Sequence, residues 1–139
     1  MKNLLIIAAA VTIGLTACQS ADTKATGNDQ GKKDSTTILW LDSTYRDLGQ
    51  VKEGTKVEVS YHFKNVGEHN LVLSNVTAQC GCTTPDWPKE PIAPGQESVI
   101  KAVFNSDGRI GENRKMVFVN ANTRPKSGDT LTFRVEITE

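Results

Sequence analysis

The fold class is decided by residues 56–64, which read KVEVSYHFK. Apolar Val57, Val59, Tyr61 and Phe63 alternate there with charged or polar residues, a period of two. Successive side chains of a β-strand point to opposite faces of its sheet, so one face of this segment is apolar and the other is polar. The stretch therefore predicts a strand that buries one face against a core and exposes the other to water.

The same alternation returns near the end of the chain, where Leu131, Phe133, Val135 and Ile137 alternate with polar residues. Shorter β-rich runs lie between these two segments, at residues 38–41, 71–76, 99–104 and 116–119. Turn residues separate the runs, and no segment has a sustained helical period. About seven short strands without crossover helices predict an all-β fold, an immunoglobulin-like antiparallel β-sandwich; a closed barrel of the same strands is the alternative.

The first residues have the three parts of a bacterial export signal. Lys2 supplies positive charge, residues 4–15 are mostly apolar, and Leu15-Thr16-Ala17-Cys18 follows. The apolar run is shorter than the roughly 20 residues that a transmembrane helix needs. Its last four residues resemble the lipobox of bacterial lipoproteins, which implies a signal peptide of residues 1–17 and a diacylglycerol on Cys18. An ordinary secretory signal with an incidental cysteine is the alternative.

Residues 18–35 contain no large apolar side chain, so we expect a flexible tether, followed by one domain over residues 36–139. Acyl chains on Cys18 would hold that domain on a membrane. Gln19 stands where an aspartate marks inner-membrane retention in many Gram-negative bacteria. The resemblance to lipoprotein signals therefore implies the cell envelope of a Gram-negative bacterium, and within it the outer membrane.

Composition argues against several classes of function. The 139 residues give room for one domain, and 16 Lys and Arg balance 16 Asp and Glu, so there is no net field to attract nucleic acid. The sequence lacks the phosphate-binding, zinc-protease and serine-hydrolase motifs. We therefore expect neither a nucleic-acid partner nor an enzyme.

Six motifs resemble those of a known family. They are LGQVKEG (48–54), FKNVG (63–67), LVL (71–73), CGCTTP (80–85), PIAPG (91–95) and FNS (104–106). Together they resemble the DUF1573 family of bacterial surface and periplasmic domains, which is similar to the ASPM-SPD2-Hydin and major-sperm-protein modules. The resemblance spans about residues 45 to 120 and implies an immunoglobulin-like fold without an assigned reaction. Within the second motif, Asn65-Val66-Gly67 predicts a turn that requires positive φ.

Cys80-Gly81-Cys82 is the chemically most specific motif. In an extended strand the α-carbons of residues i and i+2 lie about 6.6 Å apart, near the upper limit for a disulfide, and Gly81 would allow a bend that closes this gap. Three interpretations remain open. The pair is a readily reduced redox disulfide, or a dithiolate site for a soft ion such as Cu(I) with Met116 or His62 nearby, or a tight turn whose small side chains only pack.

A proline stands at every third position after this motif, at Pro85, Pro88, Pro91 and Pro94. This spacing is the repeat of a polyproline II helix, on which a partner could dock with Trp87 and Pro88 as contacts. The alternative is a rigid crossover between the two sheets, in which the missing N–H groups discourage edge pairing.

These patterns favour a non-catalytic, lipid-anchored envelope protein that binds a protein or a glycan and holds no cofactor. The alternative is a periplasmic copper-binding or thiol-redox protein that acts through Cys80 and Cys82.

Overall fold

The computed structural model describes residues 34–124 and 129–139. The predicted signal peptide, Cys18 and the tether up to residue 33 lie outside the described residues. The described residues form two four-stranded sheets, with strand orders β1-β3-β6-β5 (sheet 1) and β2-β8-β7-β4 (sheet 2). The strands are β1 (Ile38–Trp40), β2 (Tyr45–Lys52), β3 (Lys56–Asn65), β4 (Leu73–Ala78), β5 (Thr83–Asp86), β6 (Glu97–Asn105), β7 (Gly111–Ala121) and β8 (Asp129–Thr138).

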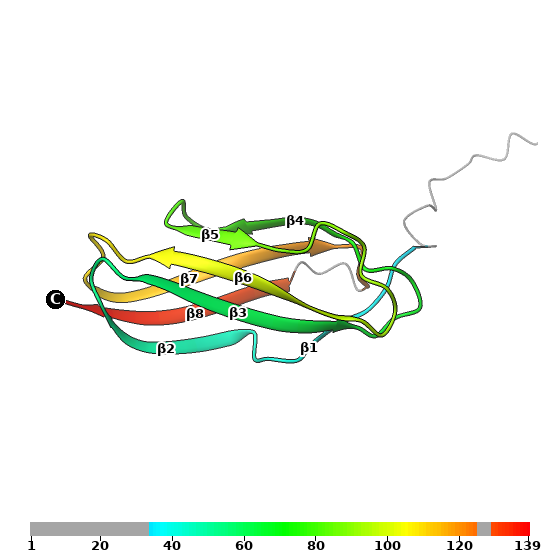
Figure 1. Cartoon of the computed structure of the whole chain (residues 1–139), viewed down its shortest axis with the longest axis horizontal. Coiled ribbons are helices and arrows are strands. Elements are labelled where there is room, and N and C mark those ends of the chain that lie inside the picture. Colours follow the sequence, from blue (N-terminus) through cyan, green and yellow to red (C-terminus); the bar gives the residue numbers. More distant parts are fainter. Residues whose placement is uncertain (1–33, 125–128) are drawn as a thin grey trace, which may run out of the picture.

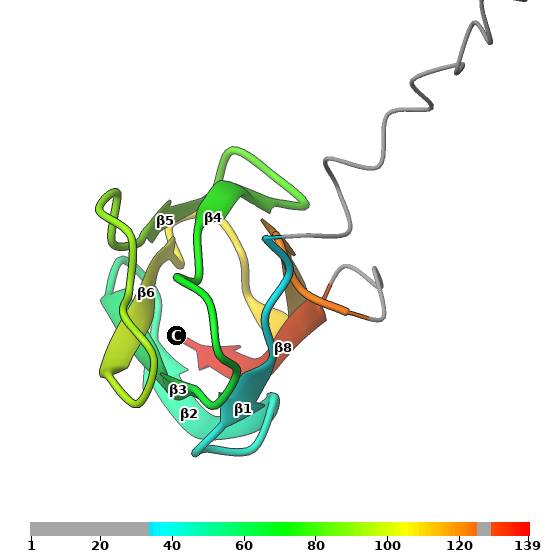
Figure 2. The same ribbon diagram turned by 90° about the vertical axis from the view of Figure 1, so that its right-hand side faces the viewer.

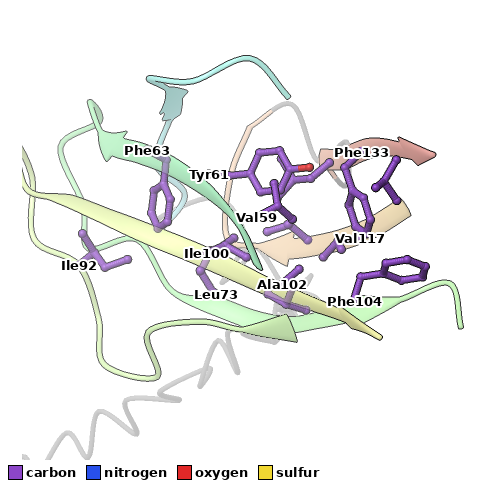
Figure 3. Packing of buried hydrophobic residues seen from close by; sticks show 14 of the residues in the cluster. Val59, Tyr61, Phe63, Leu73, Ile92, Ile100, Ala102, Phe104, Val117 and Phe133 are labelled. Carbon is purple, nitrogen blue, oxygen red and sulfur yellow. The ribbon is translucent and has the colours of Figure 1, made fainter. Parts of the chain in front are cut away.

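The two sheets pack face to face as the predicted immunoglobulin-like sandwich (Figure 1), and the view along the strands shows both layers end-on (Figure 2). The alternation that predicted β3 and β8 places their apolar residues in the space between the layers. Side chains from both sheets interlock there (Figure 3), and the rings of Phe104 and Phe133 meet edge to face at 5.8 Å. Trp40, at the margin, packs against Phe63 with a centroid distance of 5.5 Å.

Strand β2 departs from the sequence-based prediction in two ways. It was not predicted as a strand, and it pairs with β8 in parallel, whereas every other strand pair in the described residues is antiparallel. Its register shifts between Asp47 and Gln50, and Gly49 in that bulge has a φ of +70°. The bulge puts Leu48 and Val51 three positions apart while both pack against the core, so the period of two is broken.

The chain crosses from sheet 2 to sheet 1 between β4 and β5, at residues 79–82. The proline-rich stretch instead joins β5 to β6, which pair with each other in sheet 1, so its interpretation as a crossover between the sheets is wrong. Pro85 belongs to the edge strand β5, opposite Ala102, which also contradicts one continuous polyproline helix over all four prolines. An edge strand tolerates a proline because the side without an N–H faces no neighbouring strand.

Where the described chain begins, it is held between the two sheets. Thr36 pairs with Thr123 beyond the end of β7, and its hydroxyl donates to Oδ1 of buried Asn65 at 2.7 Å. The expected positive φ of Gly67 is wrong, because its φ lies outside that region. Glycine is required for space instead, since a Cβ would overlap the side chain of Thr36 and lie 2.6 Å from the main-chain nitrogen of Thr37.

Candidate functional site

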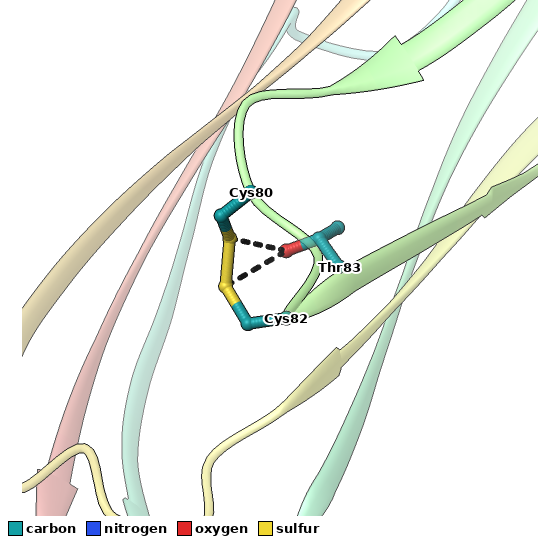
Figure 4. Close-up of a disulfide and its surroundings, with 3 residues drawn as sticks. All are labelled: Cys80, Cys82 and Thr83. Atoms are coloured by element: carbon teal, nitrogen blue, oxygen red, sulfur yellow. Dashed lines mark hydrogen bonds between the residues drawn. A yellow bond between two sulfur atoms is a disulfide. The ribbon is translucent and has the colours of Figure 1, made fainter.

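The cysteine pair lies in the turn by which the chain passes from β4 of sheet 2 to β5 of sheet 1. Strand β4 ends at Ala78, and the main chain reaches β5 at Thr83. Cys80 and Cys82 form a disulfide with a Cα–Cα distance of 5.3 Å (Figure 4). The separation is shorter than the roughly 6.6 Å of an extended strand, so the expected bend at Gly81 is present.

Main-chain hydrogen bonds define this turn on both sides. The amide of Gln79 donates to the carbonyl of Met116 on β7 at 3.0 Å, and the amide of Asn105 on β6 donates to the carbonyl of Cys82 at 2.9 Å. Thr83 closes the turn by donating its amide to Cys80 at 3.3 Å. The turn is thus attached to both sheets by main-chain hydrogen bonds.

The sulfurs lie at the boundary between core and solvent. Both cysteines are half-buried, and exposed Gly81 lies between them. The hydroxyl of Thr83, itself buried, lies 3.9 Å from each sulfur (Figure 4). One hydroxyl therefore faces both ends of the disulfide.

Lys115 lies at the same end of the core. It faces inward on β7, two positions before Val117 in the sequence. Val117 pairs with Ala78, the last residue of β4, so Lys115 lies alongside the turn that follows β4. Its ammonium lies 5.6 Å from the ring centroid of Phe104, and Phe104 pairs with Thr83. Burial lowers the pKa of Lys115, with a further contribution from the positive charge of Arg109.

His62, which the copper alternative would place near the cysteines, lies elsewhere. It pairs with Val99 on β6, whereas Thr83 pairs with Phe104, and five positions along a strand correspond to about 16 Å. Its Nδ1 lies 2.7 Å from Oδ2 of Asp42, and the main-chain amide of His62 also donates to that oxygen. The backbone bond first, and then the side-chain bond, lower the pKa of Asp42.

A copper site at this turn would use the two sulfurs as thiolates, which requires the disulfide to be open. Met116 adjoins the turn through its carbonyl oxygen. Across residues 34–124 and 129–139, no group of three or more His, Cys, Asp and Glu side chains is arranged to hold a metal ion. The described geometry thus offers a disulfide rather than a ligand set.

Trp87 and Pro88, the expected partner contacts, follow β5 at the edge of sheet 1. Both are half-buried, and Trp87 packs against the core. The ammonium of Lys89 lies over the ring of Trp87. The ring is therefore engaged on both sides within the domain.

A second candidate site, on the outer face of sheet 2, was missed by the sequence analysis. Tyr45 on β2 is 42% exposed and Phe118 on β7 is 38% exposed. Thr132 of β8 pairs with Tyr45 on one side and with half-buried Met116 of β7 on the other, and Thr130 of β8 pairs with Phe118. The two small threonines thus separate the larger side chains. We call these five residues the sheet-2 patch. Its signal in the sequence was weak, because Phe118 stands in a run of consecutive apolar residues that does not reveal which way it points.

Charged residues border the sheet-2 patch. Arg134 binds both Asp47, at 3.2 Å, and Glu112, at 2.8 Å. Arg114 takes part in none of the salt bridges between described residues, and its guanidinium lies 5.7 Å from the ring centroid of Tyr45. Arg114 also interacts with Glu112 through their charges, without a direct salt bridge, so its guanidinium remains available beside an exposed aromatic ring.

Comparison with protein families gives a single assignment. The model of DUF1573, described as a protein family of unknown function, matches residues 39–137. The chain belongs to the DUF1573 family. The match confirms the resemblance recognised in the motifs from residue 48 to residue 106. Comparison of this DUF1573 chain with curated proteins finds no match.

Solved structures share the fold of this DUF1573 domain. A protein of unknown function from Porphyromonas gingivalis W83 has a TM-score of 0.63 at 18% identity, over 74% of this chain and 47% of that one. The ASH/PapD-like domain 7 of human CEP192 has a TM-score of 0.62 at 10% identity, over 76% and 87%. The periplasmic chaperone SfaE has a TM-score of 0.53 at 12% identity, over 74% of this chain and 59% of that one. The chain thus spans about half of the P. gingivalis protein, and at these identities the likeness concerns the fold.

Proposed function

We propose that this DUF1573 domain is a non-catalytic, lipid-anchored module that binds another protein of the bacterial cell envelope through the sheet-2 patch. The observation that supports it is the pair of exposed aromatic side chains, Tyr45 and Phe118, on the outer face of a regular sheet. Aromatic residues, methionine and arginine are enriched where proteins meet, and side chains on a rigid sheet lose little freedom when they bind.

The chemistry of the patch indicates its partner. Met116 and Phe118 would contact apolar side chains, and Arg114 would receive a carboxylate that the domain itself does not supply in a salt bridge. Because Arg134 is already bound by two carboxylates, it contributes little net charge. A protein surface with apolar residues next to an Asp or Glu fits this arrangement.

Anchoring rests on the sequence. No helix of membrane-spanning length and hydropathy occurs in the described part of the chain, and the lipobox-like cysteine lies outside it. The described chain begins at residue 34, at the end of the sandwich opposite the C-terminus (Figure 1). A lipid on Cys18 would therefore hold the domain by one end and leave the outer face of sheet 2 accessible along its length.

Photo-crosslinking in the native host tests the interaction. A photoreactive phenylalanine analogue at position 118 should give one discrete protein adduct in the envelope. The matched control carries it at Thr84, an exposed position on the outer face of sheet 1. Loss of the adduct on Arg114→Ala would support the charge argument. Equal adducts from positions 118 and 84, or none from 118, would refute the patch, and polysaccharide binding that requires Tyr45 would favour a glycan instead.

Fractionation tests the anchor. The wild-type chain should partition with membranes and carry acyl mass on its first mature residue, whereas Cys18→Ser should leave both the membrane and the acylated form. A Cys80→Ser, Cys82→Ser double variant is the control for loss of any cysteine. Membrane partition of Cys18→Ser equal to wild type would contradict the anchor.

A further inference from the structure

The Cys80–Cys82 bond contributes little to holding the domain together. Its cysteines are 2 positions apart, so it closes a very short loop. In the chain-entropy account a disulfide stabilises a fold least when the loop is short. By thermodynamic linkage, a fold that gains little from a bond does little to keep that bond closed.

The turn has its own support. The amides of Gln79, Thr83 and Asn105 donate to main-chain carbonyls of the turn or of β7, and none of these bonds involves a sulfur. Opening the disulfide therefore leaves the backbone attached to both sheets. The two thiols would stay close together instead of separating with the loss of local structure.

A second molecule can reach the bond. The residue between the two cysteines has no side chain, and a Cβ built at Gly81 would meet no heavy atom within 4 Å. Attack on a disulfide requires a thiolate to approach one sulfur, so access decides the rate. This turn leaves open space beside its central residue and half-exposed sulfurs on either side.

The surroundings favour the product of such an attack. Thr83 Oγ1 lies 3.9 Å from each sulfur, and its hydroxyl can donate to whichever sulfur leaves as a thiolate. The ammonium of Lys115 lies at the same end of the core, on the strand that pairs with β4. Neighbouring cations and hydrogen-bond donors stabilise thiolates.

We propose that Cys80 and Cys82 form a thiol–disulfide exchange site that oxidises a dithiol of a partner protein. A partner thiolate attacks one sulfur, forms a mixed disulfide and breaks the Cys80–Cys82 bond. The released sulfur leaves as a thiolate that accepts a hydrogen bond from Thr83 and then takes a proton from water. The second partner thiol loses its proton to water and attacks the mixed disulfide at the partner's own sulfur. This breaks the bond to the remaining cysteine, which leaves as a thiolate and is protonated by water. Two electrons and, in net, two protons pass from the partner to Cys80 and Cys82, and the partner keeps the new disulfide.

The test uses the mature chain from residue 18 with Cys18→Ser, so that Cys80 and Cys82 are its only cysteines. The probes are glutathione redox buffers and dithiothreitol at neutral pH without denaturant, with thiols counted by alkylation and mass. The site should exchange freely while the near-UV circular dichroism of the fold stays unchanged. Thr83→Val should slow exchange about tenfold, equivalent to one hydrogen bond to a charged group. Thr83→Ser should restore the rate, and Thr84→Val on the exposed face is the matched control.

Three results would overturn the proposal. In the first, dithiothreitol leaves the bond closed until the domain is unfolded with urea. In the second, reduction unfolds the domain, which would make the disulfide structural. In the third, Thr83→Val and Thr84→Val exchange at the same rate.

Discussion

The hydroxyl of Thr36 donates a hydrogen bond of 2.7 Å to Oδ1 of Asn65, 29 residues further along the chain. Nδ2 of Asn65 donates to the carbonyls of His69 and Ile92 at 2.8 and 2.9 Å. The Asn65 side chain thus joins the beginning of the described chain to two loops at one end of the sandwich, and Asn65 itself is fully buried.

Asn65→Ala should destabilise the domain by about 3 kcal/mol, because it removes these three side-chain hydrogen bonds and leaves the buried hydroxyl of Thr36 without its acceptor. The carbonyl of Ile92 keeps its bond from the amide of Leu71. Urea unfolding followed by tryptophan fluorescence measures this loss. Asn75→Ala, at an exposed position on the edge strand β4, should change the stability by less than about 0.5 kcal/mol. Equal losses from the two variants would contradict the role assigned to Asn65.

Gly67→Ala should detach the segment around Thr36, because the added Cβ has no room beside the main chain of Thr37. We expect a cost of about 1–3 kcal/mol from overpacking. Hydrogen exchange should show faster exchange of the amides of Thr36 and Arg124, whose bonds to the carbonyls of Asn122 and Thr36 hold this segment to the chain after β7. Gly81→Ala, where a Cβ meets open space, is the control and should leave this exchange unchanged.

Phe104 and Phe133 should be energetically coupled. Each is fully buried, and their rings meet at 5.8 Å from opposite sheets. Each change to alanine should cost about 3–5 kcal/mol, and the double variant should cost about 0.5–1.5 kcal/mol less than the sum. Strict additivity in chemical denaturation would show that the two rings do not interact. The double variant Phe133→Ala, Val76→Ala is the control, because Val76 has no ring to pair with Phe133, and its loss of stability should equal the sum of the two single losses more closely.

Stability should fall at alkaline pH through Tyr61. Its hydroxyl donates to the carbonyl of Thr132 at 2.9 Å, and burial raises its pKa from 10.0 to about 12. The raised pKa means that the folded state prefers the protonated phenol. This contribution is complete below pH 10 and is lost as the pH rises toward 12.

The measurement is the urea midpoint of wild type and Tyr61→Phe over this pH window. The wild-type midpoint should fall more steeply, whereas at neutral pH the variant should be about 1 kcal/mol less stable for want of one hydrogen bond. Every other titratable side chain is the same in both proteins, so the difference between the two curves isolates Tyr61. Curves that run parallel would rule out its ionisation as the cause.

The motif of greatest chemical interest was recognisable before the structure, and its environment was not. The bend at Gly81 follows from the properties of glycine and the reach of a disulfide. Thr83 faces both sulfurs because the turn brings it back over residues next to it in the sequence. That His62 lies far from the sulfurs depends on how β5 and β3 align with β6. Cross-strand register joins residues distant in sequence, and no local pattern encodes it.

By itself, the sequence determined the fold class and the inward faces of β3 and β8, because a period of two can be satisfied only by a strand with one buried face. The motifs from residue 48 to residue 106 likewise determined the family. Only the tertiary structure decided that β2 runs parallel to β8 and that the chain changes sheets at the cysteines. It alone showed that Gly67 is needed for space rather than for its φ. Each of these depends on close packing between distant segments, which the order of residues along one strand does not specify.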